Sequence, residues 1–178
     1  YNNEWETTKS LFSFSKAYQE LTSEIVVSYS DVVYSSEIFE NLRSSKADIS
    51  FGYDSNWTNR YEGRNEEFLK EAEKVYRDEN NNILLTKKEL KHAELLGEFI
   101  GLVHFKRNVV INLESLVEKK LKNDKSSNLC DLLNECFRRN SVDLIDVKGD
   151  WAELDSPQDL IQFKFGTKSE TLQLLHNK

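Results

Sequence analysis

Short apolar runs typical of buried strands alternate along this chain with segments that favour helices. The strand-like runs fall at residues 24–29, 47–53, 97–105 and 143–147. Residues 7–21 carry apolar side chains at the spacing of one helix face, and residues 109–121 and 128–137 are also expected to be helical. Strands that alternate with helices predict an α/β sandwich built on a mainly parallel sheet.

Local signals mark where several of these elements begin and turn. Ser35 or Ser36 can cap a helix that runs through Leu42, and Ser156 followed by Pro157 is typical of a final helix start. Three successive asparagines at 80–82 lie between two strand-like segments, which predicts a β-hairpin. The polar residues 54–64 predict a loop.

Length and composition limit the classes of protein that this chain can belong to. Its 178 residues, with one proline and no linker-like stretch, predict a single domain over 1–178. A net charge of −7 argues against a nucleic-acid-binding surface, and no apolar run approaches the roughly 18 residues of a membrane span. Cys130 and Cys136 lie six apart in an expected helix, so we interpret them as reduced thiols of a cytoplasmic protein.

Two acidic clusters are candidates for metal chemistry. Asp31 follows the apolar strand at 24–29, and ligands of α/β sheets bind at the carboxyl ends of strands. From spacing alone, an ordinary strand-end or helix-capping aspartate is the better explanation of Asp31. Glu153 and Asp155 are two apart, so in an extended segment they point to the same side. Because Mg²⁺ takes few carboxylates, Asp31 with one or both of these would form a magnesium site.

A second set of candidates lies in the polar loop and in the most apolar strand. Trp57 and Tyr61 could wall a pocket for a cationic group, and Arg64 could hold a phosphate through its planar guanidinium. A solvated loop with one anchoring tryptophan is the alternative. Glu98 interrupts the apolar run at 97–105, where an unpaired carboxylate is costly, so we expect it to bind a ligand or a polar partner. Residues 71–74 are expected at the surface.

Taken in order, these segments resemble the sugar-nucleotidyltransferase superfamily, and most of all the cytidylyltransferases of phosphocholine and 2-aminoethylphosphonate. That group includes domains fused to phosphoenolpyruvate phosphomutase. The similarity covers nearly the whole chain, and its most specific parts are the strand before Asp31 and the closing motif. The segments that carry it are Trp5-Glu6-Thr7-Thr8, Ser10-Leu11-Phe12 with Ala17, Val26-Val27-Ser28-Tyr29-Ser30-Asp31, Ala47-Asp48-Ile49, Asp54 with Trp57, Gly97-Glu98-Phe99-Ile100-Gly101-Leu102 and Trp151-Ala152-Glu153-Leu154-Asp155-Ser156-Pro157-Gln158-Asp159-Leu160.

The resemblance implies a fold, a reaction and a set of site residues. The fold would be a Rossmann-like nucleotidyltransferase sandwich with a mainly parallel mixed sheet. The family's catalytic metal ligands fall on Asp31 and Asp155, with Glu153 beside them, and the metal would be Mg²⁺. The implied reaction transfers CMP from CTP, or a nucleotide from another triphosphate, to a small phosphorylated or phosphonylated acceptor. The implied acceptor pocket draws on Asp54, Trp57, Tyr61, Arg64 and Glu98.

The chain departs from this family in two ways. The family opens with a strand and a glycine-rich loop that cradle the triphosphate, and we expect this domain to lack that N-terminal portion and to be inactive alone. Ser30 stands where these enzymes often have glycine. The alternatives are a sugar-1-phosphate nucleotidyltransferase, a glycosyltransferase-like domain, or a non-catalytic module that binds a partner, or a second copy in a homodimer, through an open sheet edge.

Overall fold

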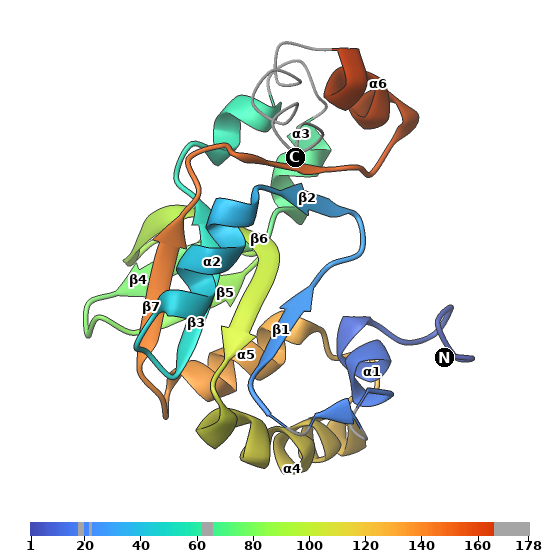
Figure 1. Ribbon diagram of the computed structural model, residues 1–178, viewed down its shortest axis with the longest axis vertical. Helices are drawn as coiled ribbons and strands as arrows, with labels where there is room; N and C mark the ends of the chain where they lie inside the picture. Colours follow the sequence, from blue (N-terminus) through green and yellow to red (C-terminus); the bar gives the residue numbers. More distant parts are fainter. Residues whose placement is uncertain (18–19, 22, 62–65, 166–178) are drawn as a thin grey trace.

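A computed structural model describes residues 1–17, 20–21, 23–61 and 66–165. Fifteen elements follow one another along these residues (Figure 1). The helices are α1 (Ser10–Ser15), α2 (Ser36–Ser44), the 3-10 helix η2 (Trp57–Tyr61), α3 (Glu66–Glu71), α4 (Arg107–Asn123), α5 (Leu129–Phe137) and α6 (Pro157–Phe165). The strands are β1 (Ile25–Ser28), β2 (Val32–Tyr34), β3 (Ile49–Asp54), β4 (Lys74–Asp78), β5 (Ile83–Thr86), β6 (Ala93–Phe105), β7 (Val142–Asp146) and β8 (Trp151–Glu153).

The main sheet is mixed, and most of its strand pairs are antiparallel. Its order is β5-β4-β6-β3-β7, and β1 also pairs with β6. The long strand β6 runs against β1, β3 and β4, and the β4–β5 hairpin adds a fourth antiparallel pair. Within the described part of the chain, β3 and β7 form the one parallel pair. The prediction of a mainly parallel sheet is therefore wrong, because one reversed central strand sets the direction of its three neighbours, and apolar patterning does not encode strand direction.

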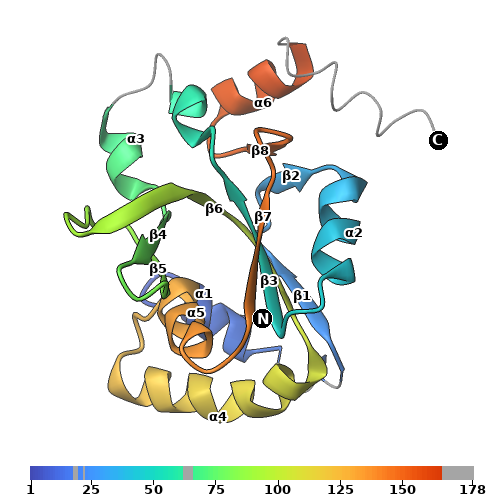
Figure 2. The same cartoon turned by 90° about the vertical axis from the view of Figure 1, so that its left-hand side faces the viewer.

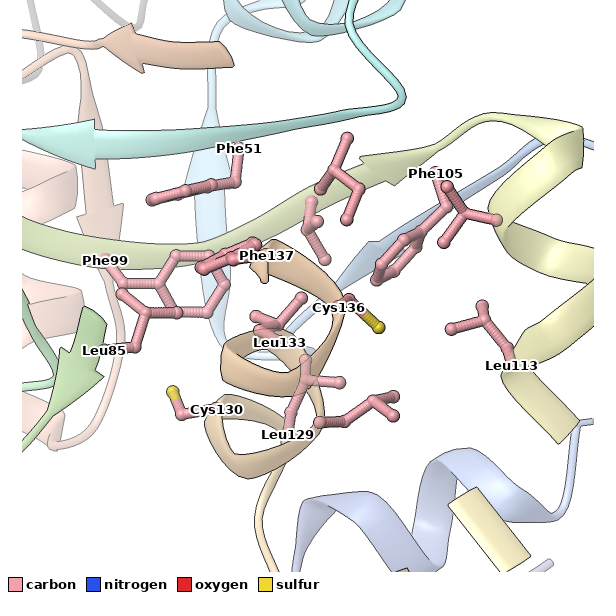
Figure 3. Packing of buried hydrophobic residues seen from close by; sticks show 14 of the residues in the cluster. Phe51, Leu85, Phe99, Phe105, Leu113, Leu129, Cys130, Leu133, Cys136 and Phe137 are labelled. Carbon is pink, nitrogen blue, oxygen red and sulfur yellow. The ribbon is translucent and has the colours of Figure 1, made fainter. Parts of the chain in front are cut away.

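Helices cover both faces of this sheet (Figure 2). On one face α2 buries Ile38 and Leu42 against Ile100 of β6 and Trp151 of β8. On the other face α1, α4 and α5 enclose the larger apolar cluster, where Phe51 of β3 faces the helices (Figure 3). The rings of Phe51 and Phe137 are stacked with centroids 5.2 Å apart. These contacts make an α/β layer structure, as expected from the alternating pattern.

Most local predictions are confirmed, and two need correction. Ser35 caps α2 by accepting a hydrogen bond from the backbone N–H of Ile38, and the predicted hairpin forms between β4 and β5. The first helix is shorter than expected, since α1 covers only six residues. The polar stretch predicted as a loop contains η2. Cys130 and Cys136 are buried free thiols, and no helix of the described residues is long and apolar enough to span a membrane.

A small two-stranded ribbon is the element that sequence patterning missed and that positions the candidate site. Strand β2 pairs antiparallel with β8, and Val32 lies opposite Glu153. The backbone N–H of Leu154 donates to the carbonyl of Asp31 over 2.9 Å. The end of β1 is thereby joined to the closing motif, more than 120 residues further along the chain.

Candidate active site

Carboxylates from both strands meet at one end of the β2–β8 ribbon, where they line a cavity of about 300 Å³. Asp31 enters from the turn after β1, and Glu153 and Asp155 enter from β8 and the residues after it. Tyr61 of η2 and Glu98 of β6 contribute to the same wall. Five of the candidate residues therefore share one cavity. Its full lining is Tyr29, Asp31, Tyr61, Glu71, Ala72, Glu73, Lys87, Glu98, Phe99, Glu153 and Asp155.

Glu98 is the most deeply buried acid of this lining, with 3% of its surface exposed. Its carboxylate accepts a hydrogen bond from the Tyr61 hydroxyl and another from Arg60 Nη1 at 3.2 Å. The expectation that a carboxylate in this apolar strand has polar partners is confirmed. Burial nevertheless dominates, and it raises the pKa of Glu98 to about 7 even though Arg60 and Tyr61 act in the opposite direction.

Arg60 is a site residue that the sequence analysis missed. Its side chain is 6% exposed, and its Nη2 donates to Glu153 Oε2 at 3.3 Å while Nη1 binds Glu98. The guanidinium carbon lies 3.8 Å from the centroid of the Trp151 ring, a short cation–π contact. Arg60 sits in a segment whose polar composition predicted a solvated loop, so no pattern in the sequence distinguishes it from Arg64. Arg64 itself lies outside the described residues.

A second missed group lies where β1 leaves the sheet. The Tyr29 hydroxyl donates to Glu73 Oε2 at 3.0 Å, and its backbone N–H donates to the carbonyl of Gly101. Gly101 has a φ of 74°, and a Cβ there would come within 2.5 Å of the Tyr29 ring, so glycine is needed at this bulge of β6. The expectation that residues 71–74 lie at the surface is wrong for Ala72 and Lys74, which are 4% and 2% exposed.

Two of the candidate acceptor residues lie behind the cavity wall. Asp54 is fully buried, and it accepts hydrogen bonds from Trp151 Nε1 at 2.9 Å and from the backbone N–H of Asn56. Trp57 is buried with its ring edge-on to Tyr61 at 5.7 Å. Neither lines the cavity in which the other candidates meet. Trp57 packs against Tyr61, and Asp54 binds Trp151, the ring on which Arg60 lies.

The donor set of the cavity suits a magnesium ion held by few protein ligands. Within the described ranges no group of three or more His, Cys, Asp and Glu side chains is arranged to hold a metal ion. Mg²⁺ is commonly bound by one or two carboxylates and completes its shell with water and phosphate oxygens. Burial raises the pKa of Glu153, and the negative charges of Asp155 and Asp31 raise it further. These carboxylates are therefore close enough to repel one another, and a cation would relieve that repulsion.

Known proteins share the fold of this chain and, to a lesser degree, its sequence. No family model matches the sequence. The chain is 23% identical over 145 residues to the CTP:phosphoglutamine cytidylyltransferase of Campylobacter jejuni, and the match covers 77% of this chain and 57% of that protein. The structure of the inositol-1-phosphate CTP transferase from T. maritima matches with a TM-score of 0.67 and 16% identity, over 96% of this chain and 64% of that one. The chain has the nucleotidyltransferase fold.

A further structure with the nucleotidyltransferase fold is that of the CTP:phosphocholine cytidylyltransferase from Streptococcus pneumoniae. It matches with a TM-score of 0.58 and 12% identity, over 92% of this chain and 65% of that one. The chain thus spans about three fifths of the length of these relatives. The resemblance inferred from the ordered motifs is confirmed at the level of the fold.

The raised pKa of Glu98 predicts a specific pH dependence of stability. The folded state keeps the Glu98 proton up to about pH 7, whereas the unfolded chain releases it near the ordinary value of 4.5. The contribution of Glu98 to the free energy of unfolding is therefore present below pH 4.5 and is lost as the pH rises to 7. We expect a loss of at most about 3 kcal/mol, since each tenfold change in proton affinity is worth about 1.4 kcal/mol.

Urea unfolding of the wild type and of Glu98→Gln at pH 4.5 and pH 7.5 measures this dependence. Glutamine does not titrate and keeps one of the two oxygens that accept from Arg60 and Tyr61. The wild type should lose more stability than the variant between the two pH values. Subtraction removes groups common to both proteins, including Glu153, whose raised pKa has the same sign. Equal losses in the two proteins would mean that Glu98 titrates normally.

Proposed function

We propose that this chain is the acceptor-side part of a magnesium-dependent nucleotidyltransferase that transfers CMP from CTP to a small phosphorylated or phosphonylated acceptor. Phosphocholine and 2-aminoethylphosphonate are acceptors of the proposed kind. We infer further that residues 1–178 belong to one nucleotidyltransferase domain. The Campylobacter and Streptococcus relatives, which are named for CTP and for phosphorylated amino compounds, support the choice of nucleotide and acceptor class.

One observation carries the proposal. Asp31 and Asp155, separated by more than 120 residues in sequence, line the same cavity because β2 pairs with β8. A carboxylate pair in the lining of a cavity is what a phosphate-binding Mg²⁺ requires from the protein. A strand-end aspartate with a purely structural role would not need an acidic partner from the closing motif.

The chain's own residues would bind and align the reactants. An oxygen of the acceptor's phosphate or phosphonate would attack the α-phosphorus of CTP, and the bond to the β-phosphate would break to release pyrophosphate. Asp31 and Asp155 would hold the Mg²⁺, which when bound neutralises charge on the transferred phosphate. Tyr61 and Glu98 would fix the position of the acceptor, since alignment of two reactants alone can supply a large part of the rate.

The chemistry of the cavity favours an acceptor that carries an amine. Three aromatic rings, those of Tyr29, Tyr61 and Phe99, line it together with the carboxylates of Glu73 and Glu98. Rings and carboxylates both attract an ammonium group, whereas the hydroxyls of a polyol need paired donors and acceptors. This lining supports phosphocholine or 2-aminoethylphosphonate over inositol-1-phosphate or a sugar 1-phosphate.

Calorimetric titration of the chain with a panel of ligands tests the proposal. Phosphocholine, 2-aminoethylphosphonate, inositol-1-phosphate and CTP would each be titrated with Mg²⁺ and again with EDTA. We expect binding of the two amine-bearing acceptors only with Mg²⁺, weaker binding of inositol-1-phosphate, and feeble or absent binding of CTP. No heat from any ligand, in a chain whose circular dichroism shows it to be folded, would contradict the proposal.

A second candidate function rests on an open sheet edge. Within the described residues β1 pairs with β6 alone, so its other edge has no neighbouring strand. Unpaired backbone groups of that kind favour addition of a strand from a partner or from a second copy. A non-catalytic module of this type would show a mass that depends on concentration and no Mg²⁺-dependent ligand binding.

A further inference from the structure

Arg60 is a buried cation whose two ion-pair partners, Glu98 and Glu153, both line the acidic cavity and come from different strands. One guanidinium nitrogen lies 3.2 Å from Glu98 Oε2 and the other lies 3.3 Å from Glu153 Oε2. The flat face of the group rests on the Trp151 ring at 3.8 Å. Since β6 and β8 supply these partners, the planar fork of Arg60 is fixed in both position and orientation.

This arrangement has a direct consequence for Glu153. Glu153 lies opposite Val32, the residue after Asp31, and it lines the same cavity as Asp31 and Asp155. In the described part of the chain these three carboxylates are nevertheless not arranged to hold one metal ion together. The Oε2 of Glu153 is instead bonded to Arg60, and its side chain is only 25% exposed. Arg60 and a bound cation would thus compete for the same carboxylate.

We propose that Arg60 is a positioning residue that sets the composition of the cation site by holding Glu153 against the cavity wall. The cation is then left to Asp31 and Asp155, with water and phosphate oxygens as its other ligands. This inference rests on the proposed function, because it takes those two aspartates as the cation site. A two-carboxylate site suits Mg²⁺, which keeps several waters, whereas Ca²⁺ takes six to eight oxygens and gains more from a third carboxylate. Arg60 would therefore also favour Mg²⁺ over Ca²⁺.

A double-mutant cycle in the whole chain tests this role through cation binding, without a measurement of activity. Mg²⁺ and Ca²⁺ would be titrated calorimetrically into the wild type, Arg60→Gln, Glu153→Gln and the double variant. We expect Glu153→Gln alone to weaken Mg²⁺ binding by no more than about threefold, since it removes a nearby charge but no ligand. Arg60→Gln should tighten Mg²⁺ binding about tenfold or more, and Ca²⁺ binding by a larger factor, because it releases a carboxylate. The double variant should lose the tighter binding of both Mg²⁺ and Ca²⁺ that Arg60→Gln alone produces.

A matched control separates this effect from a simple change of net charge. Arg77→Gln removes a cation that is paired with Glu94 at 3.8 Å, is 40% exposed and does not line the cavity. It should leave the affinity for both ions unchanged. The same gain in Arg77→Gln as in Arg60→Gln would overturn the proposal, because the effect would then be one of overall charge.

The cycle also distinguishes this inference from the proposed function. A loss of Mg²⁺ affinity in Glu153→Gln as large as in Asp155→Asn would overturn the inference and leave the magnesium site intact. A wild type that binds no Mg²⁺ would contradict the proposed function, and with it the two-aspartate site on which the inference rests. If Arg60→Gln does not fold, the Glu153→Gln result alone still tests the inference, because it neutralises a partly exposed carboxylate and leaves Arg60 bonded to Glu98.

Discussion

Replacing Asp31 by Asn is expected to abolish Mg²⁺-dependent binding of phosphocholine to this chain. Asp31 and Asp155 are the two carboxylates that the β2–β8 ribbon brings to the cavity with Glu153 already bonded to Arg60. With one of the two changed to an amide, the cation loses about half of its charged protein ligands. We expect a loss of about 100-fold or more in affinity, consistent with the several kcal/mol that a bound metal contributes at a phosphoryl group.

Without the metal, Asp31→Asn is expected not to weaken phosphocholine binding. In EDTA the wild-type cavity presents uncompensated carboxylates to the anionic phosphate, and Asp31→Asn removes one of them. The variant should then bind phosphocholine no more weakly than the wild type. Asp150→Asn is the matched control, since Asp150 is an exposed aspartate of the same closing segment that does not line the cavity. Equal affinities of Asp31→Asn and wild type with Mg²⁺ would exclude Asp31 as a cation ligand.

The sequence predicted the elements of the fold better than their arrangement. Runs of apolar residues located β1, β3, β6 and β7, and the serine at 35 located the start of α2, because local spacing and capping depend on neighbouring residues. The direction of β6 was not predictable in this way. It depends on which strands meet across the sheet, and the register between Ile25 and Phe105 is a contact 80 residues apart.

In the candidate site, too, residues marked by local sequence patterns were predicted, and residues that depend on long-range contacts were not. Asp31 was singled out because it follows a strand, and Glu153 and Asp155 because residues two apart in an extended segment point to the same side. The structure brings all three to one cavity. Arg60 was missed because its role in the site depends on contacts with Glu98 and Glu153, which are 38 and 93 residues away in the sequence. Asp54 was named as a substrate-binding residue, but the structure directs it to Trp151 Nε1 and away from the cavity.

Replacing Trp151 by Ala is expected to have the largest effect on stability. Its side chain is 2% exposed and packs with Ile38, Leu42 and Ile100 beneath α2. Truncation of a buried tryptophan to alanine costs about 3–5 kcal/mol in unfolding free energy. It also removes the indole N–H that binds the buried carboxylate of Asp54, and the ring on which Arg60 rests. Urea unfolding near pH 7 measures the change, and a loss below about 1 kcal/mol would contradict the packing described here.

The position of Trp151 on β8 adds an effect that general destabilisation does not produce. Trp151 lies opposite Tyr34 in the ribbon that holds Asp31 beside the closing motif, so its loss should also weaken Mg²⁺ binding in the fraction that remains folded. Leu132→Ala is the matched control. Leu132 is fully buried in the larger cluster on the opposite face of the sheet, and its truncation costs about 2–5 kcal/mol by the same mechanism. At a temperature well below both unfolding midpoints, Leu132→Ala should bind Mg²⁺ as the wild type does, and Trp151→Ala should not. Equal Mg²⁺ affinities in the two variants would mean that the aspartate pair is held in place without the ribbon.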